Sequence, residues 1–200
     1  MVIRPGRPPA SLVSFLDLRN ASTGETTMQK ILKTKRLTLR PLAAVDTAWL
    51  LGFWSIADVS RMTASIPARV DEDFVRGRIQ AAAEGDEAQT SIVRMIELED
   101  GTRTGVVSLD RTTTQEPFNL GYAIHPDFWC QGIATEAGQA ILDWADGFVT
   151  PKYYVSGHFT DNPASGNVLK KLGFMPCWRA PVYSTARDEK ADHLYMSRLI

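Results

Sequence analysis

A strand that passes directly into a helix is encoded by residues 118–137, which read FNLGYAIHPDFWCQGIATEA. The segment from Phe118 to His125 has the pattern of a strand, and Pro126 ends it. From Gly132 to Phe148, apolar side chains then recur at helical spacing. The first N–H groups of a helix lack backbone partners and carry partial positive charge. The junction therefore predicts an anion-binding site that needs no basic side chain.

The residues at the start of this predicted helix suit the close approach of a phosphate. Gly132 lets the chain bend and leaves the backbone accessible. Ala134 is small for the same reason, and the hydroxyl of Thr135 can donate one more hydrogen bond. The sequence contains neither G-x-x-x-x-G-K-[ST] nor G-x-G-x-x-G, so nucleotide hydrolysis and dinucleotide binding lose support. We expect main-chain N–H groups between Trp129 and Thr135 to hold a diphosphate.

Upstream of this stretch the sequence predicts a strand and two helices. Residues 36–40 alternate between polar and apolar side chains and end at Pro41, which is typical of a first strand. Asp46 and Asp71 stand where N-caps belong, each ahead of apolar residues at helical spacing. The second of these helices is expected to end at Gly85-Asp86.

Three strand-like runs follow these two helices. Residues 91–98 and 104–109 flank the turn signal Glu99-Asp100-Gly101-Thr102 and predict a hairpin. The strand 118–125 follows after a short polar loop. Because such turns leave no room for a crossover helix, the three strands are expected to form an antiparallel meander.

Beyond the helix that starts at Gly132, the pattern is broken by Pro151 and resumes with strands and one more helix. The expected segments are a strand at 152–157, a helix at 164–172 with Gly173 as its C-cap, and strands at about 174–184 and 192–199. The order βααβββαβαββ predicts a single α+β domain. Its sheet is mixed and mostly antiparallel, has about seven strands, and is flanked by helices on both faces.

Bulk composition narrows the range of functions. The 200-residue chain has a formal net charge of −1, so no overall field favours nucleic acid or an anionic membrane. No apolar run approaches the roughly 18 residues of a membrane span. The only cysteines, Cys130 and Cys177, form no metal-binding or redox spacing, so we expect no metal and a reducing cytoplasm.

The first 27 residues differ from the rest of the chain. A basic lead rich in proline and glycine is followed by the short apolar stretch Leu12–Leu18, which Ser14 and Asp17 interrupt. A signal peptide would have a cleaner apolar run and a small-residue cleavage site. Residues 1–27 are therefore interpreted as a flexible extension, or the natural chain starts at Met28, and residues 28–200 form the domain.

Three segments in order resemble the motifs of the GNAT N-acetyltransferases. The first is the opening LKTKRLTLRP at 32–41. The second is GYAIHPDFWCQGIATEA at 121–137, which is similar to the acetyl-CoA-binding motif of the branch of ribosomal-protein N-terminal acetyltransferases. The third is DNPASGNVLKKLGF at 161–174. Family members usually carry glycine where Cys130 stands. That cysteine is interpreted as a small loop residue, with a nucleophilic role as the alternative.

The resemblance implies transfer of an acetyl group from acetyl-CoA to a primary amine by direct attack in a ternary complex. It also implies that the strand 118–125 splays away from the strand 152–157, so that the pantetheine arm of the cofactor enters between them. The cofactor-binding residues are then expected to be Tyr122, Ala123, Ile124, Trp129, Cys130, Gln131, Gly132, Ile133, Ala134, Thr135 and Asn162.

The resemblance also implies three catalytic positions. Ser165 matches the residue proposed to protonate the departing sulfur, although a serine in the first turn of a helix is often only a cap. Asn162 matches a residue that contacts the pantetheine, and a helix cap ahead of Pro163 is the alternative. The general base is not where relatives often carry glutamate, since Asn119 occupies that place. Our expectation is Asp110, and the other candidates are Glu97, Glu99, Glu116 and His125. A neutral amine or a water chain, with no dedicated base, is the alternative.

The acceptor stays open at this point. The branch resemblance favours a protein amino terminus, and a small amine is the alternative. The segment 54–68 is expected to line the acceptor pocket through Trp54, Arg61 and Met62, unless it is a surface loop over the core. A non-catalytic acyl-CoA-binding or regulatory domain would show the same loop motif, and exposed strand edges near the carboxyl terminus make a homodimer plausible.

Overall fold

The structure, a computed structural model, describes residues 30–147 and 152–200. The predicted extension 1–27, the expected helix end at Phe148 and the break at Pro151 lie outside the described residues. One sheet runs through the molecule in the strand order β1-β2-β3-β4-β5-β6-β8-β7. Its strands are β1 (Leu32–Lys33), β2 (Leu37–Pro41), β3 (Ser91–Leu98), β4 (Arg103–Asp110), β5 (Asn119–Ile124), β6 (Tyr153–Phe159), β7 (Met175–Ser184) and β8 (Glu189–Leu199).

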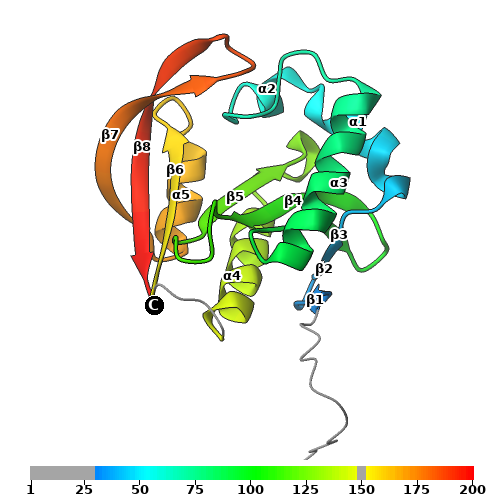
Figure 1. The fold of residues 1–200 in the computed structure, drawn as a ribbon, viewed down its shortest axis with the longest axis horizontal. Helices are drawn as coiled ribbons and strands as arrows, with labels where there is room; N and C mark the ends of the chain where they lie inside the picture. The colour runs from blue at the N-terminus through cyan, green and yellow to red at the C-terminus, as the bar shows by residue number, and fades with distance from the viewer. Residues whose placement is uncertain (1–29, 148–151) are drawn as a thin grey trace, which may run out of the picture.

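The helices cover both faces of this sheet. They are η1 (Ala44–Asp46), α1 (Thr47–Trp54), α2 (Ala57–Ser60), α3 (Glu72–Ala88), η2 (Pro126–Phe128), α4 (Ile133–Asp146) and α5 (Pro163–Lys171). Figure 1 shows α1 and α3 against one face and α4 and α5 against the other. The predicted α+β class and element order are confirmed. The sheet has eight strands because the turn at 34–36 adds the two-residue strand β1, which is too short to show a periodic pattern.

Each face has its own apolar core. The α4 face buries a continuous cluster to which α4 contributes Ala137, Ile141, Leu142 and Ala145, four residues of the predicted stripe. The second cluster joins α1 and α3 to the opposite face. It consists of Leu50, Phe53, Trp54, Val59, Ile66, Val75 and Met95. Burial of such side chains contributes about 1.5–3 kcal/mol each, so the two clusters hold the sheet between its helical layers.

Two of the predicted helix signals have different outcomes. Asp71 caps α3 as expected, since its carboxylate accepts the N–H of Phe74 at 2.8 Å. The predicted end of this helix at Gly85 is wrong. α3 continues to Ala88 and stops at Gln89, which has a left-handed φ of 56°. Gly85 packs against β3, and a Cβ there would meet the Cβ of Ser91 at 2.5 Å.

Asp46 occupies the N-cap position of α1, but its side chain does not cap that helix. The fully buried carboxylate accepts both ends of the Arg40 guanidinium at 2.8 Å, the Nε of Arg103 at 2.9 Å and the backbone N–H of Ala43 at 2.8 Å. Burial by itself would raise the pKa of Asp46, but these bonds outweigh it and lower the pKa. The predicted capping role is replaced by a buried ionic network between β2 and β4.

The sheet opens between β5 and β6. These neighbours are parallel and pair at one position only, Asn119 with Val155. The N–H of Val155 donates to the carbonyl of Phe118 at 3.0 Å, and the hydroxyl of Ser156 reaches the carbonyl of Leu120 at 2.7 Å. Beyond this point the two strands diverge, as Figure 1 shows. The interior of the sheet therefore carries unpaired backbone along β5.

Candidate active site

The loop between β5 and α4 is held by its own side chains. The indole nitrogen of Trp129 donates to the carbonyl of Ile124 at 2.7 Å, which folds the loop back on the end of β5. The side-chain amide of Gln131 donates to the carbonyl of Asp127 at 3.0 Å. The loop is thus shaped before any ligand arrives, and pre-organisation of this kind reduces the cost of binding.

Two residues of this loop have left-handed backbone conformations. Cys130 has a φ of 60° and Gly132 a φ of 78°. Glycine adopts this conformation without strain, whereas any other L-residue loses about 1–2 kcal/mol. Cys130 is exposed and has no disulfide partner. No side chain of the residues described caps α4 at Gly132, so the first N–H groups of the helix are open to a ligand, as the sequence predicts.

Glu136 joins the first turn of α4 to the turn between β1 and β2. Its carboxylate accepts the hydroxyl of Thr34 at 2.6 Å and the Nε of Arg36 at 2.7 Å. The Arg36 guanidinium also donates to the carbonyl of Gln131 at 3.2 Å. Burial alone would raise the pKa of Glu136, but the bonds from Thr34 and Arg36 lower it. The carboxylate stays ionised and fixes the position of the loop, a role beyond complementing the helix dipole.

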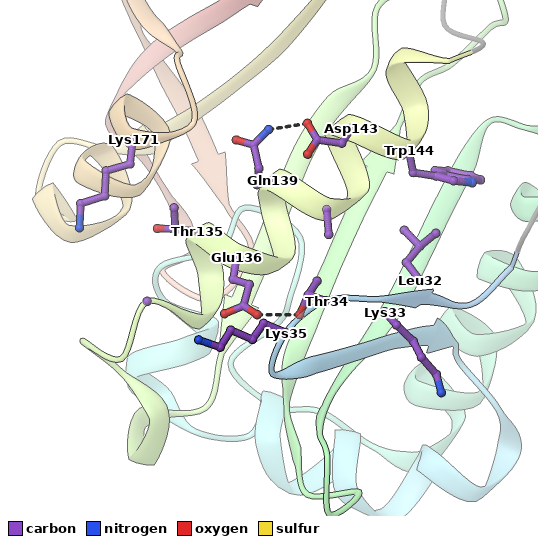
Figure 2. A pocket seen from close by; sticks show the side chains of 12 residues that line it. Leu32, Lys33, Thr34, Lys35, Thr135, Glu136, Gln139, Asp143, Trp144 and Lys171 are labelled. Atoms are coloured by element: carbon purple, nitrogen blue, oxygen red, sulfur yellow. Dashed lines mark hydrogen bonds between the residues drawn. The ribbon is translucent and has the colours of Figure 1, made fainter. Parts of the chain in front are cut away.

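A groove of about 990 Å³ follows the outer side of α4 from this turn. Figure 2 shows Lys171 of α5 and Lys35 approaching the start of α4 from different elements, with Thr34 bonded to Glu136. Farther along the helix, Gln139 donates to Asp143 at 2.5 Å. The ammonium groups of Lys35 and Lys171 therefore add a local positive field to that of the helix amino terminus, while Glu136 offsets the charge of Arg36.

The unpaired edge of β5 points into the gap beside β6. The carbonyls of Phe118 and Leu120 face β6, because Val155 and Ser156 bond to them. Backbone groups alternate along a strand, so those of Tyr122 and the N–H of Ile124 face the gap as well. The backbone of Ala123 faces β4, where this residue pairs with Val106. Of the three predicted pantetheine contacts in β5, two present free main-chain groups.

At the mouth of the gap, β5 meets the first turn of α5. The Tyr122 hydroxyl donates to the carbonyl of Ser165 at 2.9 Å and lies 2.8 Å from the Ser165 hydroxyl. Since the single proton of the phenol is directed at the carbonyl, the serine donates to the phenol oxygen. Burial raises the pKa of Tyr122 to about 12, and the bond with Ser165 opposes this shift. The phenol therefore stays protonated at neutral pH.

Asn162 caps α5. Its side-chain oxygen accepts the backbone N–H of Ser165 at 3.1 Å, which is the capping alternative considered for this residue. The cap fixes the first turn of α5 and with it the position of the Ser165 hydroxyl. A contact of Asn162 with the cofactor stays a prediction.

A cleft of about 790 Å³ extends from this gap to the α3 face of the sheet. Tyr122 and Ser165 line one end, and Trp54 and Met62 lie on the helical side. The predicted contribution of the segment 54–68 is thus found for Trp54 and Met62. Arg61 is not among the lining residues and instead lies 3.6 Å from Asp161.

The turn between β7 and β8 closes one side of the cleft. Figure 1 shows this turn reaching towards α2. The N–H and the hydroxyl of Thr185 donate to the carbonyl of Ala64 at 3.0 and 2.9 Å. Arg187 donates to the carbonyl of Arg61 at 2.8 Å and forms two bonds with Asp161 at 2.9 and 3.0 Å. The bonds to Arg61 and Ala64 bridge segments more than a hundred residues apart, so the cleft is roofed on this side.

Asp110 lies on the floor of this cleft. One carboxylate oxygen accepts the Ser91 hydroxyl at 2.5 Å, and the other accepts the Ser108 hydroxyl at 2.6 Å. Its assignment as general base stays a prediction, but each oxygen already holds a donor. The remaining predicted base candidates, Glu97, Glu99, Glu116 and His125, are not among the residues that line the cleft.

Two functional features were not found from the sequence. The sequence predicts Arg36 only as a strand residue, although it lies in the segment 32–41 that resembles the family. His193 also lines the cleft, and the buried Nδ1 of its ring has no hydrogen-bond partner within residues 30–147 and 152–200. The position of His193 in the cleft depends on the pairing of β8 with β6, which no local sequence pattern indicates.

The splayed sheet, the uncapped helix start at the end of β5 and the hydroxyl pair at the gap define the class of acetyl-CoA-dependent N-acetyltransferases. The chain belongs to the acetyltransferase (GNAT) domain family, whose model matches residues 36–175. None of the curated proteins compared with this chain matches it significantly.

Solved structures share this fold. One is the acetyl transferase of Salmonella typhimurium that modifies the N-terminal serine of a 50S ribosomal subunit protein, with a TM-score of 0.75 and 18% identity over 85% of this chain and 99% of that chain. Another is RimL, a ribosomal alpha-N-protein acetyltransferase in complex with coenzyme A, with a TM-score of 0.74 and 18% identity over 85% and 98%. The microcin C7 self-immunity acetyltransferase MccE, in complex with acetyl-CoA and AMP, gives 0.73 and 17% over 84% and 94%.

Among the described residues, no helix is long and apolar enough to cross a bilayer.

Proposed function

We propose that this enzyme acetylates the amino terminus of a polypeptide, or a slender primary amine of similar shape, with acetyl-CoA as donor. The observation that carries the proposal is a path of three successive features: the uncapped helix start at Gly132, the open edge of β5, and the roofed cleft that Ser165 lines. One end of this path suits a diphosphate, its middle suits an amide-bearing arm, and its far end suits an amine.

Different residues along this path would bind different parts of the cofactor. The N–H groups after Gly132, with Lys35 and Lys171 nearby, would bind the phosphates, and the backbone of Tyr122 and Ile124 would pair with the pantetheine arm. Ser165 would turn its hydroxyl from the phenol oxygen of Tyr122 to the departing sulfur and give it a proton, while the cap at Asn162 holds the first turn of α5 in place. Bound in this way, acetyl-CoA supplies the acetyl group as a thioester.

The roof over the cleft supports a slender acceptor. Thr185 and Arg187 tie the β7–β8 turn to the segment at 61–64, so an amine enters through an opening. A terminal amine on an extended chain passes through such an opening more easily than a lysine on a folded surface. The ribosomal-protein relatives described above act on amino termini, which favours the same acceptor here.

Release of free thiol from acetyl-CoA tests the proposal. We expect turnover with short peptides that begin with alanine or serine, weaker turnover with small amines, and none with the same peptides blocked at their amino termini. Blocked peptides that carry an internal lysine are the matched control. Binding of coenzyme A without turnover across the panel would favour the non-catalytic acyl-CoA-binding domain, and no binding at all would contradict both.

The proposal includes a cytoplasmic location and a homodimer. Cys130 and Cys177 are both exposed and unpaired, which fits a reducing compartment. Edge strand β7 exposes Met175 and Trp178 on the same face of the sheet, an apolar surface open to a second copy. Sedimentation of the full chain at several concentrations tests the dimer, and a mass equal to one chain throughout would contradict it.

A further inference from the structure

The ring of His193 lies on the acceptor side of the sheet. His193 stands opposite Phe159 in the antiparallel ladder between β8 and β6, and directly opposed residues share a face. Side chains alternate along β6, so Gly157 and Phe159 face the cleft, while Ser156 and His158 face the helices α4 and α5. The side chain of His193 therefore faces the cleft, where an amine would meet the thioester.

Gly157 leaves the room that this ring occupies. A Cβ added at Gly157 would lie 2.2 Å from the Cε1 of His193 and 3.0 Å from its Nδ1. Gly157 belongs to β6, the strand that borders the gap, so the imidazole rests against the backbone at the edge of the proposed reaction path. The buried Nδ1 atom has no hydrogen-bond partner among the described residues, and buried polar atoms without a partner are rare in proteins.

Aromatic rings hold the imidazole on its other sides. The ring centroid of His193 lies 5.5 Å from that of Phe159 and 4.7 Å from that of Tyr195, both edge-on. The guanidinium of Arg187 covers the Phe159 ring at 4.6 Å. Packing of this kind fixes the direction of the ring nitrogens, while the residue as a whole stays partly exposed to the cleft.

The charges around the ring favour its neutral form. Burial lowers the pKa of His193, and the nearby His158 lowers it further, while Asp192 opposes the shift. Asp192 itself lies 3.8 Å from Arg179 of β7, which offsets part of its charge. Arg187 behind Phe159 and the phenol of Tyr195 also face this side. Asp110, Arg78 and Tyr122 line the same cleft. A neutral imidazole is the form that accepts a proton.

We propose that His193 is the general base that takes the proton from the attacking amine. The amine nitrogen forms a bond to the thioester carbonyl carbon, the carbon–sulfur bond breaks, and one amine proton passes to the imidazole. The leaving thiolate takes its proton from the Ser165 hydroxyl, which regains one from water, and His193 returns its proton to solvent. This assignment rests on the proposed acetyl transfer.

Asp110 is the competing residue. Its two oxygens each already accept a serine hydroxyl, so a substrate amine would have to compete with these donors. Asp110 then acts as a fixed negative charge that attracts the incoming ammonium group, and His193 removes the proton.

The pH dependence of kcat/KM for the peptide acceptor tests this assignment. Wild-type activity should rise with pH through the pKa of an imidazole and then level off. His193→Gln should lose the rise at the imidazole pKa and lower kcat/KM at neutral pH by about a hundredfold. Its activity should rise only at higher pH, where solvent deprotonates the amine, and there approach wild type. KM for acetyl-CoA should stay the same, because His193 is remote from the loop at Gly132.

Two comparison variants separate catalysis from structure. His158→Gln removes a neighbouring imidazole and should keep the rise in activity but shift it to higher pH. Asp110→Asn should keep the rise at its wild-type position. A nitrogen-detected NMR titration of the three histidines in the ligand-free chain provides a readout without turnover. In that titration His193 should be neutral at pH 7.

Each result has a distinct meaning. An active wild type with an unchanged pH profile in His193→Gln, or loss of the rise in Asp110→Asn instead, would overturn the assignment and leave the acetyl transfer standing. Absence of turnover in the wild type would overturn the proposed function itself. If His193→Gln fails to fold, the NMR titration decides, since a His193 that is protonated at pH 7 contradicts the proposal.

Discussion

The Nε of Arg36 lies 2.7 Å from the carboxylate of Glu136, so the turn that follows β1 is bonded to the first turn of α4 across 100 residues of sequence. The same guanidinium reaches the carbonyl of Gln131. One side chain thus holds both ends of the segment 131–136, which carries the open N–H groups of α4. The geometry of the phosphate site depends on this contact as much as on the glycine at 132.

The first prediction concerns Glu136→Gln. Loss of the charge frees Arg36, so the loop loses its support and coenzyme A should bind about fivefold more weakly, or roughly 1 kcal/mol, as expected for a partly exposed ion pair. At saturating acetyl-CoA, kcat should be unchanged. Calorimetry and steady-state kinetics measure the two quantities. Glu72→Gln removes the exposed partner of Arg76 on α3 and serves as the matched control. Equal effects of both variants would contradict the role given to Glu136.

The second prediction uses the two cysteines as reporters. Cys130 lies in the proposed phosphate loop and Cys177 on the distant strand β7, and both are exposed. Coenzyme A should therefore slow alkylation of Cys130 severalfold and leave the rate at Cys177 unchanged, as peptide mass spectrometry would show. Protection of neither thiol at saturating ligand would place the cofactor elsewhere.

Cys130→Gly is the third prediction. The φ of 60° at this position strains cysteine but not glycine, although glycine also loses more freedom on folding. We expect a change in unfolding free energy within about 1 kcal/mol of zero and kcat close to wild type. A loss of kcat greater than about a hundredfold would instead indicate the nucleophilic cysteine considered as an alternative.

The parts of the fold that follow from local sequence were predicted, and those set by distant partners were not. The passage from β5 to α4 lies in one continuous segment whose glycine, proline and apolar spacing each indicate the same structure. Asp46 has the local signature of a cap, but its carboxylate is bonded by Arg40 and by Arg103, which is 57 residues away. No sequence motif marks His193, because its proposed role depends on its position next to Gly157 of another strand.

A fourth prediction concerns stability. Asp46→Asn leaves two guanidinium groups without their shared buried partner and should lower the unfolding free energy by about 3 kcal/mol. Asp71→Ala removes only the cap of α3 and should cost about 1 kcal/mol. Urea denaturation at pH 7 compares them. A cost for Asp46→Asn no larger than that for Asp71→Ala would contradict the network.

The same network has a defined pH dependence. The pKa of Asp46 is lower in the folded protein than its ordinary value of 3.8. The stabilisation that ionised Asp46 gives to the folded state is therefore fully present above this ordinary pKa. It is lost as the pH falls through the lower pKa of the folded protein. The difference between wild type and Asp46→Asn should narrow only at a pH below about 4. A difference that narrows between pH 7 and pH 5 would assign the effect to another group.

The last prediction concerns the hydroxyl pair at the mouth of the gap. Ser165→Ala removes the proposed proton donor and should lower kcat about a hundredfold with little change in KM for acetyl-CoA. Tyr122→Phe keeps the ring but removes the oxygen that orients the serine 2.8 Å away, so kcat should fall less, by about tenfold. Ser55→Ala, which removes an exposed hydroxyl on the end of α1, is the control. A more acidic thiol forms a more stable thiolate and needs less protonation as the carbon–sulfur bond breaks. Acetyl donors with such thiols should therefore need the serine less. The deficit of Ser165→Ala should therefore shrink with such donors, and a deficit that is the same for every donor would mean that Ser165 only shapes the site.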